Sequence, residues 1–108
     1  MSKKTYIRFS YNWNGKLACQ AFTTIRPASA LYETGERYQI FLKDEHLFDA
    51  VIIEKRRFPV SKINDFVAYL DTGYNAEECK KIINRMYKGK VTEVDFILLR
   101  RVEKKREQ

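Results

Sequence analysis

The chain has 108 residues, of which 44% are hydrophobic and 14% aromatic, enough for one ordinary domain with its own core. The formal net charge is +7, and residues 80–106 hold ten Lys/Arg against three Asp/Glu, whereas the rest of the chain is balanced. No apolar run approaches the roughly 18 residues of a membrane span, and the start, MSKKTYIRF, goes directly into a strand-like pattern. We therefore expect no membrane association, no signal peptide and a cytoplasmic location, in a bacterial or phage-infected cell.

The first half of the chain predicts four strands. Residues 5–11 alternate apolar and polar side chains, with Ile7 and Phe9 on one face. Asn14-Gly15 is a strong signal for a two-residue hairpin, so residues 17–26 are predicted to return as a second strand that ends at Pro27. Two further strands, residues 37–42 and 47–58, are separated by a polar turn at 43–46.

The second half predicts two short helices and a last strand. Ser61 is expected to cap a helix over residues 62–70, which buries a stripe formed by Ile63, Phe66, Val67 and Leu70. Asn75 is expected to cap a second helix, whose apolar stripe consists of Cys79, Ile82, Ile83, Met86 and Tyr87. Residues 91–102 are apolar on both faces, which predicts a central strand.

The order β-β-β-β-α-α-β groups strands and helices separately, which is typical of the α+β class rather than a doubly wound sheet. We expect a strongly curved sheet or small β-barrel, with the two short helices covering one opening. Residues 1–102 are predicted to form a single domain, and residues 103–108 a charged C-terminal tail.

Several familiar sites are not expected in this chain. His46 is the only histidine, and Cys19 and Cys79 are isolated in sequence, a poor set of ligands for zinc. The sequence contains neither a P-loop nor a G-x-G-x-x-G dinucleotide fingerprint. We therefore expect no metal and no cofactor.

Polar residues near breaks in the predicted elements are the candidate site. Thr23, Thr24 and Arg26 close the second strand in the segment AFTTIRP. Asp71 follows the first helix, where the helix dipole disfavours a carboxylate, so it is a candidate for another role. The alternatives are an Asx turn from Asp71 onto Gly73 and a surface salt bridge for Arg26.

The basic C-terminal third predicts contacts with a nucleic-acid backbone, or simply a solvated helix face followed by a tail. The candidate backbone contacts are Lys80, Lys81, Arg85, Lys88, Lys90, Arg100 and Arg101. Six aromatic side chains are candidates for base stacking or for core packing: Tyr11, Trp13, Tyr38, Tyr69, Tyr74 and Tyr87.

The ordered segments TTIR, YETGERYQIFL, INDFVAYLDTGY, IINRMYKG and VDFILLR resemble the ASCH domain of the PUA-like superfamily, from about Ala21 to Leu99. That family consists of small curved-sheet or barrel domains associated with RNA and modified nucleobases. The chain is also similar to the small bacterial acetylcytidine amidohydrolases, which carry K-x-x-T-x-R and a downstream acid. In these enzymes the lysine, the threonine and the acid are the proposed catalytic trio.

Carried over by position, Thr24 and Arg26 match the threonine and arginine of that motif, Asp71 matches the acid, and Tyr87 matches an aromatic beside the cleft. The lysine position is Ala21, so the resemblance implies a pocket that binds but has lost its relatives' hydrolysis. Lys16 is the nearest lysine in sequence, but eight residues of regular strand, about 26 Å, separate it from Thr24, so it needs a bulge or a fold-back to reach the site. Lys43, Lys55 or Lys90 could approach only through the tertiary fold.

Three functions remain open from the sequence. The first is an RNA- or modified-nucleobase-binding module that uses Thr23, Thr24, Arg26, Asp71 and Tyr87 as its ligand-binding residues. The second is a small hydrolase acting on an acylated nucleoside or RNA, with Thr24 and Asp71 as the candidate catalytic residues. The third is a protein-interaction module whose basic surface meets an acidic partner. We expect RNA or a nucleotide as the partner, and a monomer.

Overall fold

In residues 6–102, the part of the chain that the computed structural model describes, five strands and two helices follow one another in the predicted order. The strands are β1 (Tyr6–Phe9), β2 (Ala21–Pro27), β3 (Arg37–Leu42), β4 (Glu45–Pro59) and β5 (Glu93–Arg101), and the helices are α1 (Asp65–Thr72) and α2 (Ala76–Tyr87). Two short 3-10 segments, Trp13–Ala18 and Val60–Lys62, precede β2 and α1. The predicted tail, residues 103–108, lies outside the described residues.

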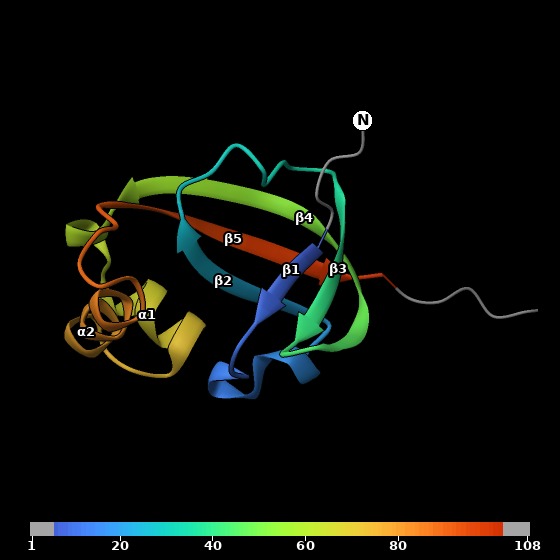
Figure 1. The fold of residues 1–108 in the computed structure, drawn as a ribbon, viewed down its shortest axis with the longest axis horizontal. Coiled ribbons are helices and arrows are strands. Elements are labelled where there is room, and N and C mark those ends of the chain that lie inside the picture. Colours follow the sequence, from blue (N-terminus) through green and yellow to red (C-terminus); the bar gives the residue numbers. More distant parts are fainter. Residues whose placement is uncertain (1–5, 103–108) are drawn as a thin grey trace, which may run out of the picture.

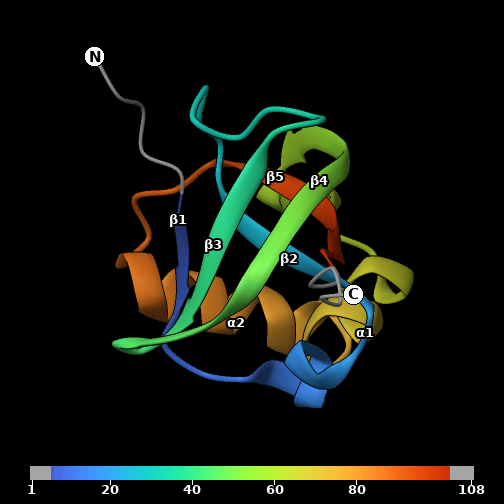
Figure 2. The ribbon, with the colours of Figure 1, turned by 90° about the vertical axis from the view of Figure 1, so that its right-hand side faces the viewer.

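The strands form one curled sheet in the order β1-β3-β4-β5-β2. β1 pairs with β3 in parallel, and the other neighbours are antiparallel. Both helices gather at one end of the curl (Figures 1 and 2). The predicted α+β class is confirmed, as is a small curved sheet of the kind that PUA-like folds have.

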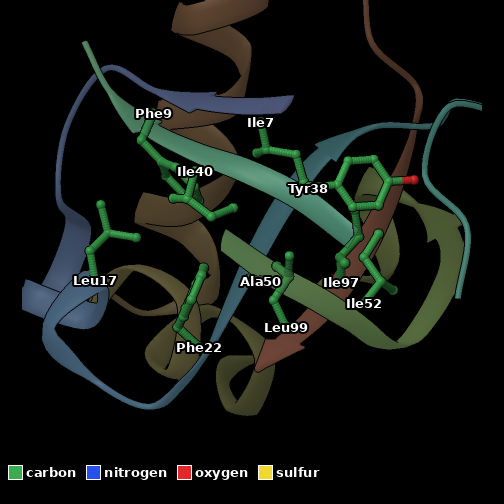
Figure 3. Close-up of a cluster of buried hydrophobic side chains, with 10 residues drawn as sticks. All are labelled: Ile7, Phe9, Leu17, Phe22, Tyr38, Ile40, Ala50, Ile52, Ile97 and Leu99. Atoms are coloured by element: carbon green, nitrogen blue, oxygen red, sulfur yellow. The ribbon is translucent and has the colours of Figure 1, made fainter. Parts of the chain in front are cut away.

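Strand alternation fills the inside of the curl with apolar side chains (Figure 3). This cluster draws on all five strands and the first 3-10 segment, and it consists of Ile7, Phe9, Leu17, Phe22, Tyr38, Ile40, Ala50, Ile52, Ile97 and Leu99. A second cluster joins the helices to the sheet through Ile63, Val67, Ala68, Cys79, Ile83 and Val94. β5 pairs with β4 and β2 and contributes to both clusters, so the prediction of a central strand is confirmed.

The predicted hairpin between the first two strands is wrong. Asn14 and Gly15 do adopt positive φ angles, 60° and 62°, but they bend the 3-10 segment instead of joining paired strands. β1 pairs only with β3, and β2 only with β5, so these two strands form the opposite edges of the curled sheet. The long-range pairing of β1 with β3 decides the topology, and local turn chemistry does not report it.

The first predicted helix is also corrected in detail. Asn64, not Ser61, caps α1, with its side-chain oxygen accepting from the Val67 amide at 2.9 Å. Helix α1 starts later than predicted and buries Val67, Ala68, Asp71 and Thr72, which leaves Phe66 and Leu70 of the predicted stripe exposed. For the second helix, the Asn75 cap is confirmed, because its side chain accepts from the Glu78 amide at 2.9 Å.

A buried carboxylate ties two strands to the loop after β2. Asp95 of β5 is fully buried and accepts from Arg57 of β4 at 2.8 and 3.2 Å, and from the Ser29 amide at 3.0 Å. Lys55 lies 3.7 Å from the same carboxylate and donates to the Tyr32 carbonyl in that loop. Burial alone would raise the pKa of Asp95, but these hydrogen bonds and the Lys55 charge outweigh it and lower the pKa below its usual value.

Candidate functional site

The opening of the curled sheet lies between its two edge strands, β1 and β2. Arg26 of β2 bridges this opening, because its guanidinium donates to the Arg8 carbonyl of β1 at 2.8 Å. A cleft of about 200 Å³ lies beside the bridge, walled by residues of β1, β2, the first 3-10 segment, α1 and α2. The fold therefore forms a cleft where the sheet fails to close.

Four of the five predicted ligand-binding residues line this one cleft: Thr24, Arg26, Asp71 and Tyr87. Thr23 does not line it; it lies instead beside Phe66, Val67 and Leu70 of α1, in the wall of another hollow. Its hydroxyl nevertheless donates to the Asp71 carboxylate at 3.0 Å. The fifth residue thus supports the site from behind its wall.

Lys16 places an amine in this cleft, although the position that the resemblance gives to a lysine is occupied by Ala21. Its Nζ lies 2.8 Å from Asp71 Oδ1 and 3.1 Å from the Asp71 carbonyl, and it lines the same cleft. The left-handed pair Asn14 and Gly15 folds the chain back so that Lys16 reaches α1, whereas Ala21 is exposed at the start of β2. The fold-back that Lys16 needs to reach the site is therefore present. In the sequence, Asn14-Gly15 was the signal for this turn of the chain.

Lys16 and Asp71 are both buried, and burial shifts the pKa of the Lys16 amine. Only 5% of each residue is exposed. Burial lowers the pKa of the Lys16 amine, and the neighbouring Arg26 adds to this effect, while the charge and hydrogen bond of Asp71 oppose it. The result is an amine whose pKa lies below its ordinary value, facing a cleft.

The position of Asp71 at a helix C-terminus now has an explanation. The Lys16 ammonium sits at the end of α1, where a cation is favoured by the helix dipole, and it binds both the carboxylate and the carbonyl of Asp71. The alternative Asx turn does not form: the Gly73 amide donates to the Tyr69 carbonyl, and the Asp71 carboxylate accepts from Lys16 and Thr23.

Arg26 is held rigidly in the cleft wall. Its Nε donates to Thr24 Oγ1 at 3.1 Å, and its guanidinium carbon lies 4.6 Å from the centre of the Phe9 ring. Within residues 6–102 no carboxylate forms an ion pair with it, so the alternative of a surface salt bridge is not what the structure has. Since Thr24 Oγ1 accepts from Arg26, its own hydroxyl proton is free to be donated to a ligand.

The stripe of α2 faces the cleft as well as the core, and all five of its members line it: Cys79, Ile82, Ile83, Met86 and Tyr87. Burial raises the pKa of the Tyr87 hydroxyl, and it raises that of the Cys79 thiol to about 11, so both groups are neutral at physiological pH.

Tyr11 and Trp13 also line the cleft, with ring centres 4.6 Å apart. The Trp13 ring centre lies 6.3 Å from that of Tyr74.

The predicted backbone-binding residues fall into two groups. Lys80, Lys81, Arg85, Lys88 and Lys90 lie on and after α2, near the cleft, whereas Arg100 and Arg101 lie at the opposite end of the molecule, where β5 ends (Figure 1). Arg101 is used internally, because it donates to the Leu17 carbonyl at 3.0 Å and lies 4.0 Å from the centre of the Phe48 ring. Only the α2 group can act together with the cleft.

A larger and separate hollow, of about 560 Å³, lies on the other face of the sheet, between α1, β2, β4 and β5. We call it the apolar groove, because Phe58, Phe66, Leu70, Phe96 and Leu98 form much of its wall. Phe66 and Leu70, the exposed apolar residues of α1, lie in the wall of this groove. None of the cationic residues that line the cleft lines the groove.

Gly73 leaves room for the Asn14 side chain at the end of α1, and alanine substitution tests this close approach. Gly73 has a φ of +81°, and an added Cβ would lie 3.1 Å from Asn14 Oδ1. Gly89, at +71° with nothing within 4 Å, is the matched control. We expect Gly89→Ala to cost about 1 kcal/mol of unfolding free energy for its backbone alone, and Gly73→Ala to cost clearly more in urea unfolding. Equal losses would mean that the Asn14 contact carries no weight.

Comparisons of the chain with protein-family models, with curated proteins and with solved structures find no match. Among the described residues, no group of three His, Cys, Asp or Glu side chains lies close enough to hold a metal ion. In the same part of the chain, no helix has the length and apolar character needed to cross a membrane. The cleft itself is therefore the basis for assigning a function.

Proposed function

We propose that this protein binds a nucleobase-bearing ligand in the cleft, as a modified nucleoside, a nucleotide or a residue of RNA. The observation that carries the proposal is the convergence of Thr24, Arg26, Asp71 and Tyr87 on one opening beside Lys16. A cleft of about 200 Å³ matches the size of a single base with part of its sugar better than that of a large ligand.

The chemistry of the wall suits a planar polar ring. Thr24 and the remaining N–H of the Lys16 ammonium can donate to ring carbonyls and nitrogens, and Tyr87, Tyr11 and Trp13 provide aromatic surfaces at its rim. The exposed cations Lys81, Arg85 and Lys88 lie on or beside α2, where they can meet a phosphate backbone leading into the cleft.

The salt dependence of RNA binding tests this arrangement. The only tryptophan of the chain, Trp13, lines the cleft, so its fluorescence reports occupancy directly. We expect a short single-stranded RNA to change this fluorescence, and the change of Lys81, Arg85 and Lys88 to Gln to weaken binding and reduce the slope of log K against log salt by about 0.7 per lost contact. Binding that is absent at low salt, or a slope that stays unchanged, would contradict the RNA form of the proposal.

A second candidate function, hydrolysis of an acyl amide on a nucleobase, is favoured by one specific observation. Lys16 stands beside Asp71 in the cleft that Thr24 lines, so an amine of lowered pKa is present where its apparent loss had argued against catalysis. In such a reaction the Thr24 oxygen would attack the acyl carbonyl and lose its proton to the neutral Lys16 amine or the Asp71 carboxylate. The C–N bond would then break, with that proton passing to the departing nitrogen of the nucleobase. Water would finally hydrolyse the acyl ester on Thr24, which releases the carboxylic acid and restores the hydroxyl.

Incubation with N4-acetylcytidine tests the second candidate. We expect the wild-type protein to release acetate and cytidine, and Thr24→Ala to lower the rate by 100-fold or more, as loss of a nucleophile does. Thr92→Ala, an exposed threonine outside the cleft, is the matched control and should keep the wild-type rate. Turnover that is equal in the wild type and Thr24→Ala would remove hydrolysis and leave binding as the function.

A further inference from the structure

A second small hollow adjoins the cleft across the Arg26 bridge. It has a volume of about 200 Å³ and is lined by Tyr6, Ile7, Arg8, Arg26, Leu31, Tyr32 and Tyr38. Arg8 and Arg26 belong to the walls of both hollows. The two spaces therefore meet at a pair of arginines, and a ligand in the cleft has these cations at one of its ends.

The charges at this junction do not balance. The cleft wall carries three cations, Arg8, Lys16 and Arg26, against the single carboxylate of Asp71. Lys16 and Asp71 neutralise each other at 2.8 Å, and within residues 6–102 no carboxylate pairs with either arginine. Two guanidinium groups beside a cleft, with no carboxylate paired to them in this part of the chain, favour a ligand that brings its own negative charge.

The two arginines are prepared for such a ligand in different ways. Arg26 is held by Thr24, the Arg8 carbonyl and the Phe9 ring, which leaves its other N–H groups without a partner among the described residues. The Arg8 side chain is exposed, and its guanidinium carbon lies 5.7 Å from the centre of the Tyr6 ring, on the side of the second hollow. An arginine held by three contacts and an exposed one can contact a phosphate from two directions.

We propose that Arg8 and Arg26 form a phosphate subsite, so that the ligand of the cleft is a nucleotide unit and not a neutral nucleoside. This inference rests on the proposed binding of a nucleobase in the cleft and extends it by one chemical group. The phosphate belongs either to a free mononucleotide, as a monoester, or to RNA, as a diester. The second hollow receives whatever continues beyond the phosphate.

Trp13 fluorescence titrations test the subsite with three sets of ligands. These are the common ribonucleosides together with N4-acetylcytidine, the corresponding 5′-monophosphates, and short dinucleotides. We expect the best monophosphate or dinucleotide to bind about tenfold more tightly than its nucleoside at low salt. The set with the larger gain identifies the source of the phosphate as free nucleotide or RNA.

The key variant is Arg8→Gln, because the Arg8 side chain makes no hydrogen bond within the described residues and its loss should leave the fold intact. We expect it to abolish the tenfold preference for phosphate while leaving nucleoside affinity within about twofold. Arg37→Gln is the matched control, since Arg37 is exposed and lies outside both hollows. This substitution removes the same charge as Arg8→Gln. It should keep the preference.

The titrations distinguish a failure of the phosphate subsite from a failure of the proposed function. If nucleosides bind but a phosphate adds no affinity, or if Arg8→Gln loses no more than Arg37→Gln, the phosphate subsite is refuted and nucleobase binding stands. If neither nucleosides nor their phosphates change Trp13 fluorescence, the proposed function itself fails, and the subsite falls with it.

Discussion

Replacement of Asp95 by alanine is expected to lower the free energy of unfolding by about 3–5 kcal/mol, because it removes one side of a buried, hydrogen-bonded charge cluster. Asp95 is fully buried and satisfies Arg57, the Ser29 amide and the charge of Lys55. Without it, the Ser29 amide loses its acceptor and two cations lose their partner. Urea unfolding followed by circular dichroism measures the loss.

Asp49→Ala is the matched control for Asp95→Ala. Asp49 also pairs with two basic side chains, Arg37 and His46, at 3.0 Å each, but its side chain is 25% exposed. Water can replace these partners, so we expect a loss of no more than about 1 kcal/mol. Similar losses at the two positions would mean that the burial of the Asp95 cluster is not what makes it stabilising.

The pH dependence of the unfolding free energy is an independent test of the Asp95 cluster. The pKa of Asp95 is lower in the folded protein than its ordinary value of 3.8. The ionised form therefore stabilises the fold above pH 3.8, and this contribution is lost only as the pH falls through the lowered pKa. The stability advantage of the wild type over Asp95→Asn should thus persist at pH 4. An advantage that disappears between pH 6 and 4 would contradict the lowered pKa.

The second large loss of unfolding free energy is expected when the Lys16–Asp71 pair is broken. Asp71→Leu leaves a buried ammonium without its carboxylate, and Lys16→Met leaves the carboxylate with Thr23 alone, so each should cost about 3–5 kcal/mol of unfolding free energy. The double variant Lys16→Met/Asp71→Leu removes both charges together. We expect it to return to within about 2 kcal/mol of the wild type, since apolar side chains of similar size replace buried ion pairs well.

The same double variant separates stability from function. If the pair serves the cleft, the double variant folds but no longer changes its Trp13 fluorescence with nucleosides or RNA. A double variant that is as unstable as the sum of its single variants would instead make the pair a structural element. A double variant that folds and binds normally would take both residues out of the site.

Much of the fold follows from local pattern. The sequence predicted a strand at residues 37–42, the same bounds as β3, and the apolar residues on both faces of the last strand identified β5 as central. The Asn75 cap located the start of α2. The predictions that are wrong concern contacts between segments that are distant in sequence. Asn14-Gly15 has the backbone of a tight turn, but the pairing of β1 with β3 decides what that turn connects.

The candidate site was predictable where it lies on regular elements. Alternation along β2 puts Thr24 and Arg26 on one face, and the unfavourable position of the Asp71 carboxylate at a helix end made it a candidate for another role. Its partner, Lys16, could not be assigned from sequence because a fold-back, and not a strand, carries it to α1. Arg8 was not predicted at all, since only the packing of the two sheet edges places it beside Arg26.

The central claim is that ligand binds in the cleft at the open edge of the sheet. Chemical shift mapping by NMR tests it most directly, with isotope-labelled protein titrated with N4-acetylcytidine and with the 5′-mononucleotides. We predict that the largest changes fall on the amides of Ser10, Ile25, Thr72 and Met86, which line the cleft. Changes confined to Phe66, Leu70 and Leu98 of the apolar groove, or no changes at any concentration, would contradict the claim.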